Sequence, residues 1–334
     1  MPLSLPLPEW LTALLGSPWP WPLLQAGALL LAWALDRRFG EPPDRWHPVA
    51  WLGRLLGPVG RFWRDRAPAA AFAGGALSWL LIAAALAGAA WALQRWIVTL
   101  PGPLALGLLA LALKPLFACR MLCDEVAAVE AALAQSLEAG RARLAWLVSR
   151  DVTRLDAGEV RESAIETLAE NLNDSVVAPL FWFALGGLPG AALYRFANTA
   201  DAMWGYPGMR GGRYWQWAGK WAARADDVLS WVPARITALL LAVVAKGLPF
   251  STLARQARKT PSPNSGWPMA AMALALNVRL AKPGVYTLHS KGRRAGPLDT
   301  RRAARLGTQV VLAMLPVVAA LQLLMLVVVA WAQA

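Results

Sequence analysis

The chain has 334 residues, of which 57% are hydrophobic and only 16% charged, and its mean hydropathy is +0.41. That composition excludes an ordinary soluble domain and indicates an integral membrane protein. The formal net charge of +13 could suggest nucleic-acid binding. In a membrane protein, however, basic residues mark cytoplasmic loops and contacts with anionic lipid headgroups, so no nucleic-acid partner is expected.

The first part of the chain predicts three membrane helices and a basic loop. Residues 1–22 lack a basic leader and are interpreted as a Trp- and Pro-rich interfacial segment that the mature protein keeps. Residues 23–35 predict a first span, and residues 69–93 and 100–118 predict a hairpin of two more. The Arg-rich loop after the first span is expected in the cytoplasm by the positive-inside rule.

Two features around these spans carry expectations of their own. His47 precedes Pro48 and should therefore have extended or turn backbone; a lone histidine is more often structural, but His47 is kept as a candidate substrate-binding residue. Residues 119–149 predict one or two amphipathic helices outside the membrane, with a break at Gly140.

Three hydrophobic segments follow, and the first of them is interrupted. Residues 176–196 contain a Gly- and Pro-rich interruption at 186–190. Two half-helices that re-enter on the same side fit this pattern as well as one crossing, and the arginine-rich loop beyond favours re-entry. Residues 232–250 and 310–331 predict further spans. The expected fold is a single all-α domain over residues 1–334, polytopic with about four to six membrane helices, possible re-entrant half-helices and helical cytoplasmic loops.

Polar side chains gather in the region 150–235. Asp156 followed by Glu159 predicts a capping box that opens a helix. Carboxylates then recur on one face of this helix at i,i+4 spacing, and Asn173 and Asp174 extend that face by a further turn. This glutamate row consists of Glu162, Glu166 and Glu170.

Like charges at this spacing destabilise a helix by about 0.2–0.5 kcal/mol per pair unless a cation faces them. One interpretation of the glutamate row is a solvated acidic face paired with arginines such as Arg154 and Arg161. The other is a functional site. The apolar segment that begins at Val176 favours the functional interpretation, because acidic groups beside a membrane segment tend to hold ions, partners or substrates.

The residue types in this region suit phosphate chemistry. Carboxylates with a neighbouring Asn suit Mg²⁺, which takes one or two carboxylates together with waters and substrate phosphate oxygens. Arginines bind phosphate through paired hydrogen bonds. The region 150–235 therefore predicts a phosphoryl-handling site at the membrane surface.

Several long motifs carry a resemblance to one family. They are GEPPDRWHPVAWLGRLLG, SRDVTRLDAGEVRESAIETLAENLNDSVVAPLFW, YRFANTADAMWGY, AARADDVLSWVPARITALLL and SPNSGWPMAAMALALNVRL. In this order, from about Leu35 to Leu280, the chain resembles the CobD/CbiB family, the adenosylcobinamide-phosphate synthases of cobalamin biosynthesis. It departs from the family pattern at Ser175, where Gly is expected, at Ala200 and Ala202, and in a shorter, more basic segment at 283–297.

The resemblance implies an amide-forming ligase. The free propionate carboxylate of adenosylcobyric acid would be joined to aminopropanol or its O-phosphate, with ATP as co-substrate and Mg²⁺ as cofactor. Implied partners are the corrinoid, the amino-alcohol phosphate, ATP, membrane lipids and other enzymes of cobalamin assembly. The implied location is the inner cell membrane, with a multi-pass chain and a cytoplasmic active site.

With that reaction in view, the polar residues divide by role. Glu166, Glu170, Asp174 and Asp227 are the expected catalytic residues. The expected metal ligands are Glu170, Asp174 and Asp201. The expected substrate-binding residues are His47, Arg150, Asp151, Asn171, Arg195, Asn198, Asp201, Tyr206, Arg224, Asp226 and Asn264.

Simpler interpretations stand beside these roles. Asp226 and Asp227 could form a structural ion-pair cluster with Arg224 and Arg235, and residues 262–266 could be only a turn. Rival functions are a transporter, which should repeat its polar motifs in matched halves of the chain, and a non-catalytic membrane sensor or scaffold, which should lose the acidic residues.

Overall fold

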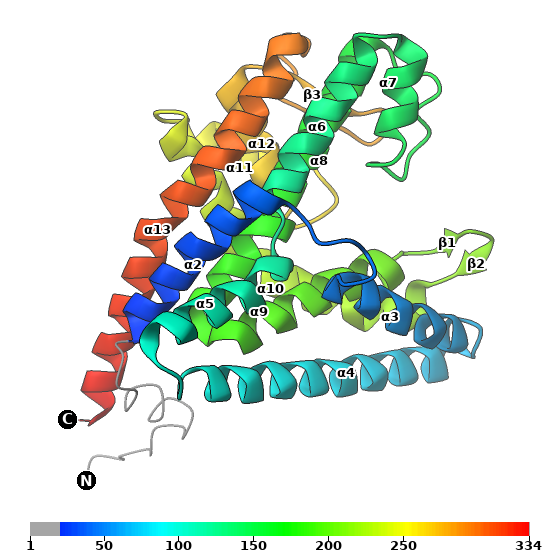
Figure 1. Ribbon diagram of the computed structural model, residues 1–334. Coiled ribbons are helices and arrows are strands. Elements are labelled where there is room, and N and C mark those ends of the chain that lie inside the picture. Colours follow the sequence, from blue (N-terminus) through cyan, green and yellow to red (C-terminus); the bar gives the residue numbers. More distant parts are fainter. Residues whose placement is uncertain (1–20, 334) are drawn as a thin grey trace. The chain divides into compact units, whose positions relative to one another are not determined.

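The structure is a computed structural model that describes residues 21–333, and nearly every element in it is helical (Figure 1). The interfacial segment predicted for residues 1–22 lies almost wholly outside the described part of the chain. The described residues divide into two compact units. The first unit holds residues 21–117, 179–226 and 315–333, and the second holds residues 118–178 and 227–314.

The first unit is built from long apolar helices. Helix α4 (Pro68–Ile97) opens with proline, whose missing N–H removes no hydrogen bond at a helix start. Helix α2 (Trp21–Phe39) packs on α5 (Gly102–Leu113), and α3 (Pro48–Arg64) packs on α4. The other elements are a 3₁₀ turn (Lys114–Leu116), most of α9 (Ala178–Trp204), the hairpin of β1 (Met209–Arg210) and β2 (Arg213–Tyr214), the start of α10 (Gln216–Val244) and the end of α13 (Pro297–Gln333).

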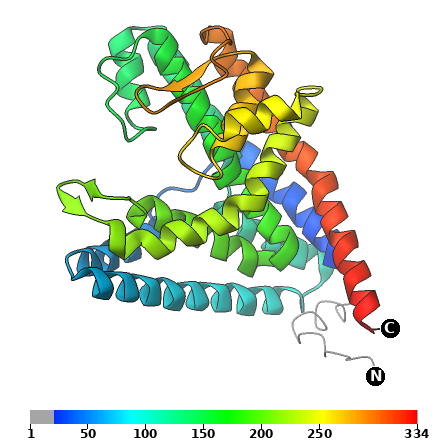
Figure 2. The same ribbon diagram turned by 180° about the vertical axis from the view of Figure 1, so that it is seen from behind.

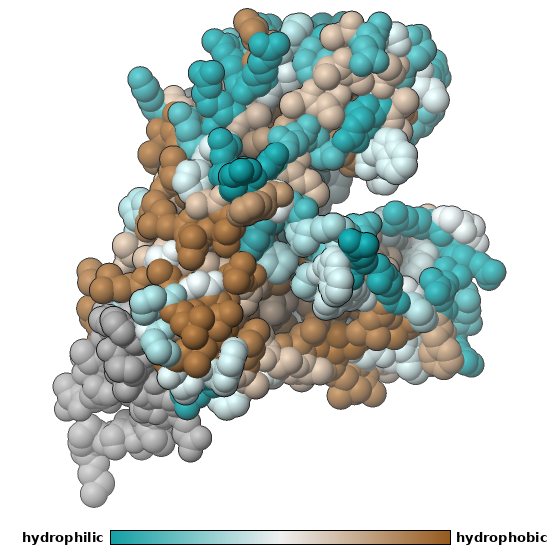
Figure 3. Space-filling view, viewed as in Figure 1, coloured by the Kyte–Doolittle hydropathy of each residue, from teal (hydrophilic) through white to brown (hydrophobic). Residues whose placement is uncertain are grey.

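Five helical stretches within residues 21–333 are long and apolar enough to cross a membrane, in agreement with the predicted four to six. Only 11% of the apolar window of α4 is buried inside the protein, and Figure 3 shows hydrophobic surface along this helix. The five stretches are Pro68–Ile97, Gly102–Leu133, Ala157–Trp204, Gln216–Val244 and Pro297–Leu324.

Helix α2, predicted from residues 23–35 as the first span, is not one of the five stretches. It is helical as expected, but Asp36, Arg37 and Arg38 occupy its last turns. The apolar part that remains is shorter than the roughly 20 residues that crossing a bilayer needs.

The predicted interruption of residues 176–196 is confirmed and lies at Gly187. Its φ of 63° and ψ of −150° are nearly exclusive to glycine, so α9 consists of two helical segments joined at this residue. Gln94 on α4 satisfies the released backbone, because its Oε1 accepts a hydrogen bond from Leu188 N at 2.7 Å. Internal partners of this kind allow broken backbone at membrane depth, where water is absent.

Two further glutamines bind the carbonyl groups just before the break. Gln25 Nε2 donates to Phe183 O at 2.8 Å, and Gln322 Nε2 donates to Ala184 O at 2.7 Å. Both glutamines are buried, and they contact each other. Helices α2 and α13 therefore hold the first segment of α9 at the point where its own hydrogen-bond ladder stops.

The second unit surrounds α8 (Ala157–Leu172). The predicted capping box is confirmed: Asp156 Oδ1 accepts from Glu159 N at 3.0 Å, and Glu159 Oε2 accepts from Asp156 N at 2.9 Å. Helix α8 packs on α6 (Cys119–Leu133), α7 (Leu137–Leu144) and α12 (Gly266–Leu276). The unit also contains most of the apolar half of α10, α11 (Phe250–Ala257), β3 (Leu280–Lys282), β4 (Tyr286–Leu288) and the first part of α13; Figure 2 shows α11 and α12 in yellow, next to each other.

The prediction that Gly140 breaks the segment 119–149 is wrong. The chain leaves the helix at residues 134–136, where Ser136 Oγ caps α7 by accepting from Ala139 N at 3.0 Å. Gly140 lies inside α7, and a Cβ there would come within 2.3 Å of Leu133 Cδ2. Its small size serves the close packing of α7 on α6 rather than a break.

Candidate active site

The glutamate row on α8 faces cations from a segment that begins at Arg279 and ends at Arg294. Arg279 Nη2 lies 3.3 Å from Glu162 Oε1, which is fully buried. Arg294 donates to both carboxylate oxygens of Asp156 at the start of α8. These hydrogen bonds hold the pKa of Asp156 below its usual value. The row therefore has counter-charges, as its spacing requires.

The partners considered from the sequence, Arg154 and Arg161, are not the ones that the structure provides. Arg161 Nη2 lies 2.8 Å from Glu130 Oε1 on α6. It turns away from the glutamate row, because residue 161 and residue 162 occupy different faces of a helix. The acidic face is thus an internal surface of the second unit rather than a solvated one, with Glu162 and Glu166 both buried.

The hairpin of β3 and β4 brings a tyrosine onto this surface. The strands pair antiparallel with Lys282 opposite Tyr286, and Gly284 takes a φ of 74° in the turn between them. Tyr286 Oη donates to Glu166 Oε1. Burial, and then the charge and hydrogen bond of Glu166, raise the pKa of the Tyr286 hydroxyl, so it stays a neutral donor.

Glu166 and Arg150 form the centre of the site. Glu166 is 3% exposed, and its Oε1 also lies 3.0 Å from Arg150 Nη2. The other carboxylate oxygen, Oε2, and the other guanidinium nitrogen, Nη1, are buried without a hydrogen-bond partner in the part of the chain that the structure describes. Buried polar atoms nearly always have partners in folded proteins. An acceptor and a donor thus remain here for water or a ligand.

Glu170 stands one turn beyond Glu166 and is half-buried. The carboxylates of Asp174 and Glu166 repel its negative charge, and the cations Lys282 and Arg150 attract it. The charged residues around Glu170 come from four parts of the chain. Arg150 precedes α8, Glu166 lies on α8, Asp174 lies in the turn after it, and Lys282 lies on β3.

A π-helical turn (Asn173–Val177) follows α8 and positions Asp174. Asn173, which is buried, donates from Nδ2 to Asp174 Oδ1 at 2.7 Å, and its Oδ1 accepts from Thr237 Oγ1 at 3.2 Å. Such turns occur frequently at functional sites, because they displace side chains from the regular helical row. Asn173, which the sequence did not single out for a role, thus holds Asp174 in position.

The predicted metal set divides between the two units. Glu170 and Asp174 belong to the second unit and Asp201 to the first, and no three His, Cys, Asp or Glu side chains within residues 21–333 are grouped to hold a metal ion. Mg²⁺ commonly takes one or two protein carboxylates and completes its shell with waters and substrate phosphates. The pair of Glu170 and Asp174 fits that mode, whereas a cage built wholly from protein does not.

Two other predicted residues of the second unit have local partners. Asp151 is exposed, and its Oδ1 accepts from Thr153 N at 2.9 Å and from Thr153 Oγ1 at 2.7 Å; the backbone bond, followed by the hydroxyl, lowers the pKa of Asp151. Asn171 Nδ2 donates to Thr167 O at 2.9 Å within its own helix. Asp151 shapes the turn before α8, and Asn171 keeps its amide oxygen for other contacts.

Asn264 fixes a loop onto α10. Its Oδ1 accepts from Arg235 Nη1 and its Nδ2 donates to Asp227 O, both at 2.8 Å. Ser262 Oγ accepts from Asn264 N at 3.2 Å, in agreement with the turn interpretation of residues 262–266. No hydrogen bond or ion pair among the described side chains joins the Asp227 carboxylate to α8, although Asp227 belongs to the same unit.

Within residues 21–333, neither Arg224 nor Arg235 forms the ion pair with Asp226 or Asp227 that one interpretation of the sequence expected. Arg235 donates to Asn264 and to the backbone, and Arg224 is exposed. Asp226 Oδ1 instead accepts from Asn198 Nδ2 at 3.4 Å in the first unit.

The first unit holds the remaining predicted residues. Asp201 Oδ1 lies over Gly205, where any Cβ would come within 1.8 Å of it. Tyr206 Oη donates to Ala202 O at 2.7 Å, and the Arg210 guanidinium lies 3.6 Å from the centre of its ring. Arg195 lines an otherwise largely apolar cavity of about 440 Å³ with residues of α3, α4 and α5.

His47 has the extended backbone predicted for it and caps α3. Its Nδ1 accepts from Val49 N at 3.1 Å, and its Nε2 lies 2.7 Å from Glu41 Oε2. Lys114 Nζ donates to Glu41 Oε1 at 2.7 Å and also lies 3.2 Å from Oδ1 of buried Asp36. His47 thus belongs to a polar cluster of the first unit in which Lys114 and Asp36 are buried and Glu41 and His47 are half-buried. The sequence offered one indication of this cluster: Lys114 is a charged residue within the apolar segment 100–118.

The partners of the glutamate row were also missed from the sequence, although a signal existed. Between Asp227 and Asp299 the chain has no Asp or Glu and ten Lys or Arg. A helix with three aligned glutamates and a long acid-free segment are complementary in charge. That complementarity, rather than local spacing, pointed to Arg279 and its neighbours.

Taken together, the apolar helices and the buried acid–base surface define a polytopic α-helical membrane protein with a polar site. Comparison with known proteins narrows this class. The profile of the CobD/Cbib protein family matches residues 29–331, and the chain belongs to that family.

Curated relatives agree with the family assignment. A probable cobalamin biosynthesis protein CobD of Methanothermobacter thermautotrophicus is 41% identical over 79% of this chain and 86% of the relative. One from Pyrococcus abyssi is 42% identical over 84% of this chain and 90% of the relative. The cobalamin biosynthesis protein CobD of Chromobacterium violaceum is 41% identical over 83% of this chain and 90% of the relative. No solved structure matches the chain.

Proposed function

We propose that this protein is a membrane ligase of cobalamin biosynthesis. It joins the free propionate carboxylate of adenosylcobyric acid to aminopropanol or its O-phosphate, at the expense of ATP. Family membership and the names of the relatives support the pathway. The observation that carries the site is the buried pair of Glu166 and Arg150, in which one acceptor atom and one donor atom have no protein partner.

The reaction requires an activated carboxylate, because a carboxylate anion is a poor electrophile. An oxygen of the propionate attacks the terminal phosphorus of ATP, the bond to the bridging oxygen breaks, and ADP leaves. The amine nitrogen then attacks the acyl carbon of the resulting acyl phosphate. A C–N bond forms, inorganic phosphate leaves with the electron pair of the C–O bond, and the nitrogen loses a proton to a base.

The residues of the second unit divide this work. Arg150, with Nη2 on Glu166 and Nη1 unpartnered, donates to a substrate phosphate. Glu170 and Asp174 would hold Mg²⁺, which supplies charge neutralisation at the phosphates. Glu166 Oε2 is the unpartnered buried acceptor, and it takes the proton that the amine loses.

Product analysis by mass spectrometry tests the reaction. The full chain in lipid nanodiscs would be incubated with adenosylcobyric acid, aminopropanol phosphate, ATP and Mg²⁺. We expect a corrinoid with the mass of the condensed amide, absent without ATP. Glu170→Gln should lower its rate of formation by about 10²-fold or more.

The matched control is Glu138→Gln on α7, an exposed glutamate of the same unit, which should keep the wild-type rate. Asp227→Asn tests the expected catalytic residue whose carboxylate has no hydrogen bond or ion pair to α8 within residues 21–333. Full ligation by Glu170→Gln would overturn the assigned site. Corrinoid binding without product in the wild type would overturn the ligase and point to a scaffold.

A further inference from the structure

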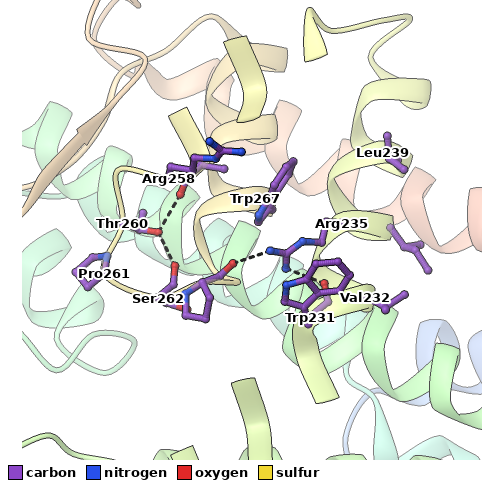
Figure 4. Close-up of a pocket in the computed structure, with 12 residues that line it drawn as sticks. Trp231, Val232, Arg235, Leu239, Arg258, Thr260, Pro261, Ser262 and Trp267 are labelled. Atoms are coloured by element: carbon purple, nitrogen blue, oxygen red, sulfur yellow. Dashed lines mark hydrogen bonds between the residues drawn. The ribbon is translucent and has the colours of Figure 1, made fainter. Parts of the chain in front are cut away.

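A cavity of about 720 Å³ lies in the second unit between the apolar half of α10 and the loop that joins α11 to α12. None of the residues assigned to the ligase reaction lines it. The lining combines apolar side chains with two arginines, one on α10 and one on the loop side, and two hydroxyl groups from the loop (Figure 4). Its lining from α10 is Trp231, Val232, Arg235, Ile236 and Leu239, and its lining from the loop side includes Arg258, Thr260, Ser262 and Trp267.

Arg235 is a fixed cation at the wall of this cavity. Its Nη1 donates to Trp231 O and Asn264 Oδ1, each at 2.8 Å, and its Nη2 donates to Pro263 O at 3.1 Å. The rings of Trp231 and Trp267 lie 4.2 Å and 5.0 Å from the guanidinium carbon. A guanidinium has five N–H donors, so two remain after these three bonds. The side chain is held in place yet can still bind an anion.

Two more groups at the same wall can donate. The Arg258 guanidinium is exposed, and no hydrogen bond or ion pair within residues 21–333 engages it. Ser262 Oγ accepts from Asn264 N and Ser265 N, both at 3.2 Å, which leaves its own hydrogen free to donate. No carboxylate lines the cavity. The polar wall is therefore built to receive a negative charge, and nothing within the wall neutralises it.

The apolar wall continues beyond the cavity along α10. Val232, Ile236, Leu239 and Val243 recur at intervals of three and four residues, so they form one stripe on a helical face. Val232 is 42% exposed, Leu239 49% and Val243 70%. In a helix apolar enough to cross a membrane, this stripe contacts hydrocarbon. These two walls suit a ligand with an anionic head and a long apolar body.

We propose that this cavity is a binding site for one anionic phospholipid. Its phosphodiester accepts from Arg258, Arg235 and Ser262, and an acyl chain follows the stripe from Val232 to Val243. Two uncompensated cations select a headgroup without a positive charge, such as phosphatidylglycerol, over phosphatidylcholine. Tryptophan beside arginine at the rim is the side-chain pairing found where lipid headgroups meet hydrocarbon.

Native mass spectrometry of the detergent-purified full chain tests the proposal, with phosphatidylglycerol and phosphatidylcholine of identical chains as probes. We expect the wild type to retain one phosphatidylglycerol at concentrations at which phosphatidylcholine dissociates. Arg258→Gln should weaken this retention about tenfold, because a charge-assisted hydrogen bond is lost. The matched control is Arg255→Gln, which removes the same charge from α11 outside the cavity and should behave as wild type.

Equal loss in Arg255→Gln and Arg258→Gln would mean a general charge effect and would overturn the site, as would equal retention of the two lipids. Leu239→Asn tests the apolar wall against Leu77→Asn, an exposed leucine of α4 outside the cavity lining; only Leu239→Asn should reduce retention strongly. A soluble competitor, glycerol 3-phosphate, separates the sources of the phosphate. Displacement of the lipid by an equal concentration of this competitor would show that the acyl chain contributes nothing, and would overturn the lipid assignment.

Discussion

Arg150 Nη2 lies 3.0 Å from Glu166 Oε1, and the two side chains are only 17% and 4% exposed. A buried ion pair of this kind contributes little net stability, yet removing one partner is costly because the other charge stays buried. Glu166→Gln and Arg150→Gln should therefore each destabilise the protein by about 3 kcal/mol. The double variant should lose clearly less than the sum, since it leaves neither charge alone. Unfolding in detergent, followed by circular dichroism, would measure this cycle.

The control for the cycle is an exposed ion pair at helical spacing, Arg120 with Asp124, 3.2 Å apart. Its single Gln and Asn variants should each change stability by less than about 0.5 kcal/mol. Additive losses at Arg150 and Glu166 would contradict the pairing described here.

Tyr286→Phe isolates the second contact of Glu166. The variant removes one hydroxyl that donates to a buried carboxylate and keeps the ring. It should lower the unfolding free energy by about 1–2 kcal/mol and slow amide formation. Tyr214→Phe, whose ring is 46% exposed, should change neither quantity measurably. Equal effects of the two variants would remove Tyr286 from the site.

The half-buried pair of Glu41 and His47, together with buried Lys114, predicts a pH dependence. Burial alone would raise the pKa of Glu41, but hydrogen bonds from His47 and Lys114 outweigh it and leave that pKa below its ordinary value of 4.5. An acid with a depressed folded-state pKa binds its proton more weakly when folded. Its stabilisation is therefore present above pH 4.5 and is lost as the pH falls through the folded-state pKa.

Melting temperatures of the wild type and Glu41→Gln, measured from neutral pH to below pH 4.5, check this dependence. The variant should melt below the wild type at neutral pH, and the difference should shrink steadily as the solution is acidified below pH 4.5. A difference that stays constant, or grows on acidification, would show that Glu41 is not held as a charged partner of Lys114.

The sequence predicted the features that depend only on residues close together in the chain. The capping box of Asp156 and Glu159 needs only a spacing of three residues, and the break at Gly187 needs only a cluster of glycines and proline. Gly140, a lone glycine, was also expected to break a helix and does not, because its small size serves a tertiary approach to Leu133. A glycine in the sequence can mark either a helix break or a close packing contact, and only the tertiary structure distinguishes the two.

The candidate site was predictable as a set of residue types and not as a geometry. The glutamate row was visible from its spacing. Tyr286, however, comes from 120 residues away, through a hairpin whose register places it opposite Lys282. The charge balance of the distant segment could have indicated a cationic partner, but no spacing rule could have selected this tyrosine as the donor to Glu166.

Gln94→Leu tests how the membrane-embedded break is held. The variant keeps the side-chain size and removes the acceptor of Leu188 N, 2.7 Å away. An N–H without a partner in a water-free environment should cost about 1–3 kcal/mol. The loss should appear as a lower midpoint in denaturant unfolding of the detergent-solubilised protein. Gln135→Leu, at an exposed site between α6 and α7, should stay within about 0.5 kcal/mol of wild type.

Gly187→Ala and Gly88→Ala should differ in their effects on stability. At Gly187 the backbone is in a region that L-residues avoid, and a Cβ would come within 2.1 Å of Gln94 Oε1. Both the strain and the lost hydrogen bond act against the folded state, so the variant should lose at least about 1–3 kcal/mol. Gly88 lies in the middle of α4, where a Cβ meets no atom within 4 Å and alanine favours helix by about 0.5–1 kcal/mol. Gly88→Ala should therefore unfold at or above the wild-type midpoint. If Gly187→Ala unfolded there too, the break between the two segments of α9 would not depend on the left-handed backbone at residue 187.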